Sequence, residues 1–144
     1  MHETFLLPDV DDEDGAPFWA GTARGELRVQ ACGDCNRLRF PPRPMCPHCQ
    51  SLATGWRPVS GRGAIWSFAV VHPPLLPAYA ALAPYPVVVV ALVEDATLRM
   101  VGNIVAAADA PINSVSPCDL AIDQEVRATF AEVDGVHFPR WVRV

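Results

Sequence analysis

The chain has 144 residues, of which 51% are hydrophobic and 19% are charged. This composition indicates a folded chain of one domain's length, with at most a small appendage, and excludes a chain that is disordered as a whole. Eleven Lys and Arg against sixteen Asp and Glu give a formal charge of −5 and a pI near 5.2, opposite to the basic surface typical of nucleic-acid binders. Fifteen prolines and nine glycines disfavour long helices and favour a β-rich fold.

The N-terminal residues show no basic segment followed by an apolar stretch, so we expect neither a secretory signal nor a transit peptide. A cytoplasmic location follows as the default expectation. The stretch 75–93 lacks formal charges, but its prolines would break a membrane-spanning helix repeatedly. We interpret it as the end of a proline-rich loop over 72–86 and a strand over 87–93 that is buried on both faces.

An acidic arm and a short helix are expected in residues 1–25. Acidic residues gather between positions 9 and 14, and we expect a flexible arm whose last carboxylate, Asp14, caps a helix over 16–24. Pro17 suits the first turn of this helix. The neighbouring aromatics Phe18 and Trp19 are too large to be buried by so short a helix, so they dock either on the remaining fold or on a partner.

Several strands are expected in the rest of the chain. Alternating apolar residues over 26–31 predict a strand that leads into the first cysteine pair. Five further strands are predicted over 64–71, 87–93, 98–105, 124–133 and 138–144, with Trp66, Phe68 and Val70 on the core face of the first. This pattern is typical of an OB-fold barrel, although a sandwich of similar strands would give it as well. The predicted units are the arm and helix (1–25), a metal-binding ribbon (26–58) and the barrel (59–144).

The most specific motif is a pair of C-x2-C knuckles separated by ten residues, formed by Cys32, Cys35, Cys46 and Cys49. Four thiolates can surround one tetrahedral zinc ion at Zn–S distances of about 2.3 Å. Such a site has no open position for water or substrate, so the ion would be structural. The alternatives are iron in the same site, two disulfides or a redox dithiol; the cytosol disfavours disulfides, and a redox dithiol leaves the second pair unexplained.

Candidates for catalysis are few. The sequence contains no nucleophile elbow, phosphate-binding glycine loop, histidine-rich metal motif or paired-carboxylate signature. His72 and His137 are the acid/base candidates, and each is equally compatible with an ordinary position at a barrel rim. His48 lies between two predicted ligands and is interpreted as exposed, and Cys118 as a free thiol with no nearby base. We therefore do not expect a self-sufficient enzyme.

Four segments together resemble a known family. They are ARGELRVQACGDCNRLRFPPRPMCPHC, VSGRGAIWSFAVVHPP, YPVVVVALVE and FAEVDGVHFPRW, and they extend over nearly the whole chain. The sequence is similar to the DUF35 proteins. The resemblance implies an N-terminal helix, a rubredoxin-like zinc ribbon held by the four cysteines, a C-terminal OB-fold of five strands and an association with acyl-CoA metabolism.

The resemblance also implies a function, that of a non-catalytic partner subunit of a thiolase-superfamily enzyme. Such partners include acetoacetyl-CoA thiolase, thiolases of aromatic degradation and the lipid-transfer-protein type aldolases that shorten steroid side chains. A CoA thioester would be a shared ligand, and the two-fold axis of the partner enzymes implies a two-plus-two heterotetramer. The Ala-, Pro-, Arg- and Val-rich composition favours the steroid-type aldolase.

Two groups of residues are expected to make contacts in such a complex. The proline-stiffened loop would lose little entropy on docking, and with the helix aromatics it gives a predicted partner patch of Phe18, Trp19, Leu75, Leu76, Tyr79, Leu82 and Tyr85. The alternative is that these residues cover one mouth of the barrel. Arginines in and just after the ribbon suit the phosphates of CoA, and the candidates are Arg39, Arg43 and Arg62.

A second functional hypothesis is a single-stranded nucleic-acid-binding OB-fold protein. Trp66, Phe68 and Trp141 would then be the platforms on which bases stack. The net charge and the predicted core position of Trp66 and Phe68 speak against it. A third hypothesis, an independent acyl-CoA hydrolase, lacks an identifiable nucleophile and base.

Overall fold

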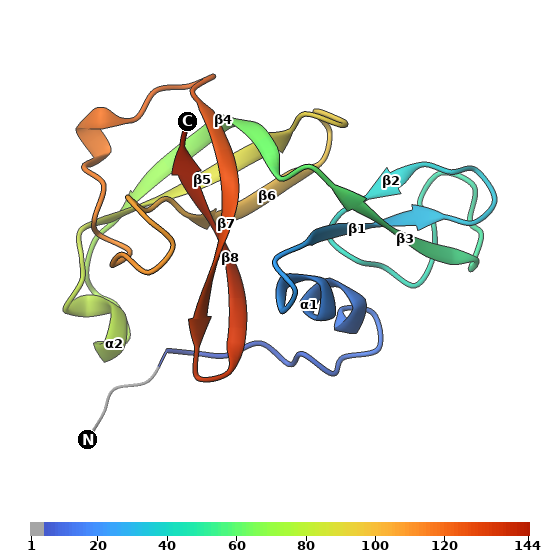
Figure 1. Cartoon of the computed structure of the whole chain (residues 1–144), viewed down its shortest axis with the longest axis horizontal. Coiled ribbons are helices and arrows are strands. Elements are labelled where there is room, and N and C mark those ends of the chain that lie inside the picture. Colours follow the sequence, from blue (N-terminus) through green and yellow to red (C-terminus); the bar gives the residue numbers. More distant parts are fainter. Residues whose placement is uncertain (1–4) are drawn as a thin grey trace.

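The computed structural model describes residues 5–144 and contains an N-terminal helix, a three-stranded sheet and a five-stranded sheet (Figure 1). The predicted mainly β fold, with a helix followed by a ribbon and a barrel, is confirmed. Within the described range, no helix is long and apolar enough to cross a membrane. The boundaries placed after residues 25 and 58 remain predictions.

The arm was expected to be flexible, but its residues Phe5 and Leu6 are held against Tyr79 of the proline-rich loop. Phe5 packs edge-on against Tyr79 with ring centroids 4.8 Å apart. The backbone N–H of Leu6 donates a hydrogen bond of 3.3 Å to the Tyr79 hydroxyl. Two apolar residues thus precede the acidic segment and hold this part of the arm in place. Residues 1–4 of the predicted arm lie outside the described residues.

Helix α1 (Ala16–Thr22) is shorter than predicted and is not capped by Asp14. Its N-cap is Gly15, which has no side chain to donate or accept a hydrogen bond. The Asp12 carboxylate instead accepts the Gly15 N–H at 3.1 Å. Gly25, with a φ of 71°, reverses the chain after the helix and directs it into the first strand, a conformation that glycine adopts without strain.

The ribbon sheet consists of three antiparallel strands in the order β2-β1-β3. They are β1 (Leu27–Cys32), β2 (Leu38–Arg39) and β3 (Thr54–Val59). The strand predicted over 26–31 corresponds to β1. The other two were not predicted, because β2 has only two residues and β3 contains a glycine and a proline, residues that sequence patterns assign to turns.

The five-stranded sheet has the order β6-β5-β4-β7-β8, and every neighbouring pair is antiparallel. The two edges meet where Ile104, just after β6, bridges Trp141 of β8, and the Val105 N–H donates to the Trp141 carbonyl at 2.8 Å. The sheet therefore closes into a barrel and the sandwich is excluded. The strands are β4 (Arg62–Val71), β5 (Tyr85–Leu92), β6 (Arg99–Asn103), β7 (Glu125–Val133) and β8 (Val136–Arg143).

The loops contain two short helical turns, α2 (Pro77–Ala80) and the 3₁₀ turn Pro117–Asp119. The first lies inside the predicted proline-rich loop. Strand β5, predicted to be buried on both faces, alternates instead: Val88 and Val90 are fully buried, whereas the valines between and before them are half-buried. One face of β5 packs in the core and the other lies on the outside of the barrel.

The orientation predicted for Trp66 is wrong because a β-bulge interrupts β4 between Ile65 and Ser67. A bulge places one extra residue on a strand and shifts the side chains that follow to the other face. Ile65 is fully buried, while Trp66 is 50% exposed. The Arg99 guanidinium stacks over the outward-facing indole, 3.7 Å from the ring centroid.

One hydrophobic core extends from the helix through the ribbon into the barrel. The first half of β1, the end next to the barrel, contributes Leu27 and Val29, and α1 contributes Phe18. The barrel supplies most of the other buried side chains, which include Ile65, Val88, Val90, Leu92, Leu98, Met100, Ile104, Val115, Leu120, Val126 and Trp141. The ribbon is therefore attached to the barrel by shared packing, and its far end carries the cysteines.

Replacing Gly63 by Ala should destabilise the barrel by about 1–3 kcal/mol, the range typical of overpacked sites. A Cβ at Gly63 would lie 2.5 Å from the Ala91 carbonyl oxygen, which is backbone of the paired strand and can move only if β4 and β5 separate. Gly55→Ala is the matched control, since a Cβ there meets only the Ala31 oxygen at 3.7 Å. Urea unfolding of both variants measures the difference, and equal midpoints would contradict the tight approach at Gly63.

Candidate zinc centre and apolar cavity

The two knuckles bring the four predicted sulfur ligands together, with all four Sγ atoms within 4.8 Å of one another. Cys32 Sγ lies 3.5 Å from Cys49 Sγ, and Cys35 Sγ lies 3.7 Å from Cys46 Sγ. Four tetrahedral Zn–S bonds of about 2.3 Å separate the sulfurs by about 3.8 Å, so the cluster fits a zinc ion. Since a disulfide needs about 2.05 Å and all cysteines are free, the hypothesis of two disulfides is wrong.

Backbone N–H groups inside each knuckle favour the thiolate form that a metal requires. The N–H groups of Cys35 and Asp34, each 3.4 Å from Cys32 Sγ, lower the pKa of Cys32 to about 6. In the second knuckle, the N–H groups of Cys49 and His48 lower the pKa of Cys46. The turns therefore stabilise negative charge on Cys32 and Cys46, whereas the neighbouring sulfurs and burial raise the pKa of Cys49 to about 12, so a cation is needed for all four to be thiolates.

The segment between the knuckles is held by the buried side chain of Gln30 in β1. Its Oε1 accepts from Arg39 Nε and from the Arg43 N–H, both at 2.7 Å. Arg39 also donates through Nη2 to Thr54 Oγ1 at 3.0 Å and is only 6% exposed. Arg39 is thus a structural residue of the ribbon, and its predicted contact with a CoA phosphate is wrong for this conformation.

The two other arginine candidates are exposed but lie on different elements. Arg43 belongs to the segment between the knuckles, whereas Arg62 begins the barrel strand β4. Arg62 lies near the Glu94 carboxylate, whose pKa is lowered mainly by its hydrogen bonds with Ser60 and in part by this guanidinium. A phosphate contact through Arg43 or Arg62 remains a prediction.

Part of the predicted partner patch is buried within this chain. Phe18 is 6% exposed and packs against Trp19 and Phe40, with ring centroids 5.0 and 5.5 Å apart. Tyr85 is 7% exposed at the start of β5. The Trp19 ring is partly buried against Phe138 at 5.9 Å. The helix aromatics therefore dock on their own fold, and Phe18 and Tyr85 are not available to a partner in this conformation.

No catalytic pair forms among the candidates within the described residues. His72 is exposed and belongs to neither ion pair of the described residues. His137 Nε2 lies 3.7 Å from a Glu132 carboxylate oxygen. His48 is exposed and its Nδ1 lies 2.7 Å from Arg37 Nη1. Cys118 is exposed in the 3₁₀ turn, apart from the cysteine cluster.

The stacking platforms required by the nucleic-acid hypothesis do not form one surface. Trp141 is 1% exposed in the barrel core. Phe68 is half-buried against the same core. Trp66 alone faces outward, and one side of its ring is covered by Arg99. Three residues arranged in this way cannot stack successive bases of one strand.

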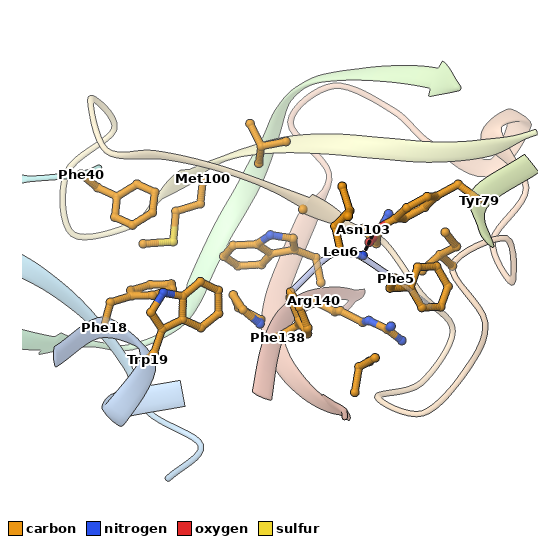
Figure 2. A pocket seen from close by; sticks show the side chains of 16 residues that line it. Phe5, Leu6, Phe18, Trp19, Phe40, Tyr79, Met100, Asn103, Phe138 and Arg140 are labelled. Carbon is orange, nitrogen blue, oxygen red and sulfur yellow. Dashed lines mark hydrogen bonds between the residues drawn. The ribbon is translucent and has the colours of Figure 1, made fainter. Parts of the chain in front are cut away.

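An apolar cavity of about 340 Å³, which the sequence did not indicate, lies between the N-terminal arm, α1 and the barrel (Figure 2). The arm contributes Phe5 and Leu6, the helix contributes Trp19, and β8 contributes Arg140. The apolar triplet at positions 5–7, directly before the acidic segment, is the sequence signal that could have indicated a docked arm. Further lining residues include Phe18, Phe40, Tyr79, Met100, Asn103, Ile112, Phe138 and Trp141.

A ribbon with four clustered cysteines joined to a closed five-stranded OB barrel defines the class of protein, a zinc-ribbon OB-fold protein. Family models describe the same two parts: residues 19–54 match the "ChsH2, rubredoxin-like zinc ribbon domain", and residues 56–131 match the "ChsH2, C-terminal OB-fold domain". The chain belongs to this ChsH2 (DUF35) family.

Curated relatives carry two kinds of names. The chain is 34% identical over 137 residues to the 3-oxo-4,17-pregnadiene-20-carboxyl-CoA hydratase alpha subunit of Mycobacterium tuberculosis, covering 94% of this chain and 38% of that protein. It is 35% identical over 118 residues to a probable enoyl-CoA hydratase alpha subunit of Thermomonospora curvata, covering 81% and 33%. A DUF35 domain-containing scaffold protein of Methanocaldococcus jannaschii is 31% identical over 113 residues, covering 73% and 71%. The chain thus spans between a third and two fifths of the hydratase subunits.

Two solved structures share the fold. A chain of the Ltp2-ChsH2(DUF35) aldolase superposes with a TM-score of 0.80 at 30% identity, covering 95% of this chain and 98% of that one. A DUF35 protein of unknown function from Sulfolobus solfataricus superposes with a TM-score of 0.61 at 10% identity, covering 94% and 89%. The second likeness shows the fold alone.

Proposed function

We propose that this chain is a non-catalytic accessory subunit that binds and stabilises a thiolase-superfamily enzyme, an acyl-CoA aldolase or thiolase, and helps to form its acyl-CoA site. The observation that carries the proposal is the similarity, over 95% of this chain, to a chain of the Ltp2-ChsH2(DUF35) aldolase. The scaffold name of the archaeal relative supports it. The steroid-type name of the M. tuberculosis relative supports a role in steroid side-chain degradation.

The names of the hydratase relatives do not require hydratase activity in this chain. This chain corresponds to between a third and two fifths of those subunits. Within residues 5–144, the histidines and the free thiol Cys118 form no nucleophile–base pair. The four clustered cysteines fit a closed structural ion, which supplies no Lewis acid to a substrate. The chemistry is therefore assigned to the partner enzyme.

The remaining features of the proposal follow from the family. The CoA thioester is a ligand shared with the partner, and the complex is a cytoplasmic two-plus-two heterotetramer. The surface proposed for docking is the loop patch, defined as Leu75, Leu76 and Leu82, since Tyr79 of the predicted patch packs against Phe5 and lines the cavity. Leu76 is 55% exposed and the other two are half-buried. Prolines on both sides restrict the backbone, so docking loses little conformational entropy.

Replacing Leu76 by Glu should weaken binding of the partner enzyme at least about tenfold, because it introduces a charge into a surface that becomes desolvated. Ile122→Glu is the matched control, since Ile122 is 54% exposed but lies outside the loop patch. The experiment is co-expression with a thiolase-superfamily enzyme as the candidate partner, followed by size-exclusion chromatography and a retro-aldol or thiolytic assay.

We expect the wild type and Ile122→Glu to elute with the enzyme and to support its activity, and Leu76→Glu to elute alone. If both variants co-elute with the enzyme equally well, the interface does not include the loop patch. A wild-type chain that elutes alone, beside an enzyme that is fully active without it, would overturn the proposed function itself.

A further inference from the structure

The cavity between the arm and the barrel has an apolar end and a polar end (Figure 2). Phe18, Phe40 and Met100 gather at one end, where no charged group is drawn among the lining side chains. Asn103, Tyr79 and Arg140 gather at the other end, next to the arm. A ligand that fills this space must therefore be amphipathic, with its polar group near β8 and the arm.

Arg140 gives the polar end a positive charge, and within residues 5–144 no carboxylate forms an ion pair with it, although Asp109 and Glu132 line an adjoining hollow. Its Nη1 donates to the Ala110 carbonyl oxygen at 3.1 Å. The two ion pairs of the described residues, Arg28 with Glu26 and His137 with Glu132, do not include it. Arg140 is half-buried, and this burial lowers the pKa of its guanidinium. Because a guanidinium stays protonated in proteins and carries five N–H donors, most of its donor capacity is left for an anion.

The hydroxyl of Tyr79 adds a second donor at the same end. It accepts the Leu6 N–H at 3.3 Å, drawn as a dashed line in Figure 2, so its own proton can be donated. The same hydrogen bond fixes the arm as one wall of the cavity. A guanidinium and a hydroxyl on one side of an apolar cavity match the two oxygens of a carboxylate.

The cavity volume limits the size of the apolar part. At about 340 Å³, the space is near the lower end of the range of about 300–1,000 Å³ for ligand pockets. A flexible chain of medium length fits such a volume, whereas a whole CoA does not. The aromatic and thioether side chains at the apolar end suit an alkyl chain.

From these observations we propose that the cavity binds a medium-chain monocarboxylate, with its carboxylate on Arg140 and its alkyl chain toward Phe18 and Met100. The site belongs to this chain alone and its ligand is the free acid. The proposal goes beyond the accessory function and does not depend on the identity of the partner enzyme.

Octanoate binding to the zinc-loaded 144-residue chain, measured by isothermal titration calorimetry, tests the proposal. We expect Arg140→Gln to weaken binding at least about tenfold, because it removes a charge-assisted hydrogen bond to the carboxylate. Arg143→Gln is the matched control, since Arg143 lies on the same strand, is exposed and does not line the cavity. 1-Octanol, with the same alkyl chain and no charge, should bind more weakly than octanoate to the wild type.

A second readout uses only the wild type and holds even if the Arg140 variant fails to fold. Of the four tryptophans, Trp19 and Trp141 line the cavity and Trp56 and Trp66 do not. Octanoate should shift the indole N–H resonances of the first pair and leave those of the second pair in place. The proposal is overturned if no cavity indole shifts at millimolar octanoate, if all four shift alike, or if 1-octanol binds as tightly as octanoate.

Discussion

Replacing Cys46 by Ser should abolish stoichiometric zinc binding and unfold the far end of the ribbon, residues 32–54. Cys46 is 1% exposed, and its Sγ lies 3.7 Å from that of Cys35 within the cluster of four sulfurs. The ribbon packs on the core through Leu27 and Val29 and through partly buried residues such as Phe40, but none of the four cysteines belongs to this core, so the two knuckles depend on the metal. Zinc contributes on the order of 10 kcal/mol to the folding of such modules, more than any single side chain of the barrel.

The matched control for this prediction is Cys118→Ser, which removes an exposed thiol outside the cluster. Zinc content per chain and hydrogen exchange measure the result. We expect one zinc ion in the wild type and in Cys118→Ser, and a loss of amide protection in Cys46→Ser that is confined to the ribbon. Retention of one zinc and of full protection in Cys46→Ser would show that the four sulfurs do not form the site.

The zinc centre and the barrel could be predicted because both depend on local sequence patterns. Two residues between cysteines are enough to direct both thiolates at one point, whatever the rest of the fold does. Alternating apolar residues located three of the five barrel strands, since the period of two is a property of the strand itself, and a continuous apolar run located β5. The structure brings the four sulfurs within 4.8 Å of one another, as zinc binding requires, and joins the five strands in one closed sheet.

Side-chain burial was harder to predict because it depends on tertiary contacts. Phe18 was assigned to a partner surface, but Phe40 from the segment between the knuckles covers it. Arg39 was assigned to a phosphate, but its hydrogen bonds to Gln30 and Thr54 bury it in the ribbon. In both cases the covering groups come from distant positions in the sequence, and no local pattern records them.

The apolar cavity was missed for the same reason. Its walls come from the arm, α1, β6 and β8, which no period in the sequence connects. The acidic residues at 9–14 led to the prediction of a flexible arm. The contacts of Phe5 and Leu6 with Tyr79 were therefore not predicted. The strand that contains Arg140 was predicted from its apolar residues. The sequence does not indicate that Arg140 lacks a carboxylate partner among the described residues.

The two tryptophans of the barrel give the sharpest test of the corrected strand geometry. Replacing Trp141 by Ala should destabilise the protein by about 3–5 kcal/mol, the range for large aromatic residues deleted from a core. Its side chain is 1% exposed, and its indole packs so closely on Gly102 that a Cβ there would lie 3.0 Å from Nε1. The residue also lies where β8 meets the segment after β6 and the barrel closes.

Trp66→Ala is the matched control, because the bulge turns this indole outward to 50% exposure. Its loss removes the stacking with Arg99, worth about 0.5–1 kcal/mol at exposed sites, and a partly exposed apolar surface. We expect Trp66→Ala to destabilise far less than Trp141→Ala in urea unfolding followed by far-UV circular dichroism. If the two variants lose similar stability, Trp66 lies on the core face as strict alternation predicts, and the bulge between Ile65 and Ser67 is not present in solution.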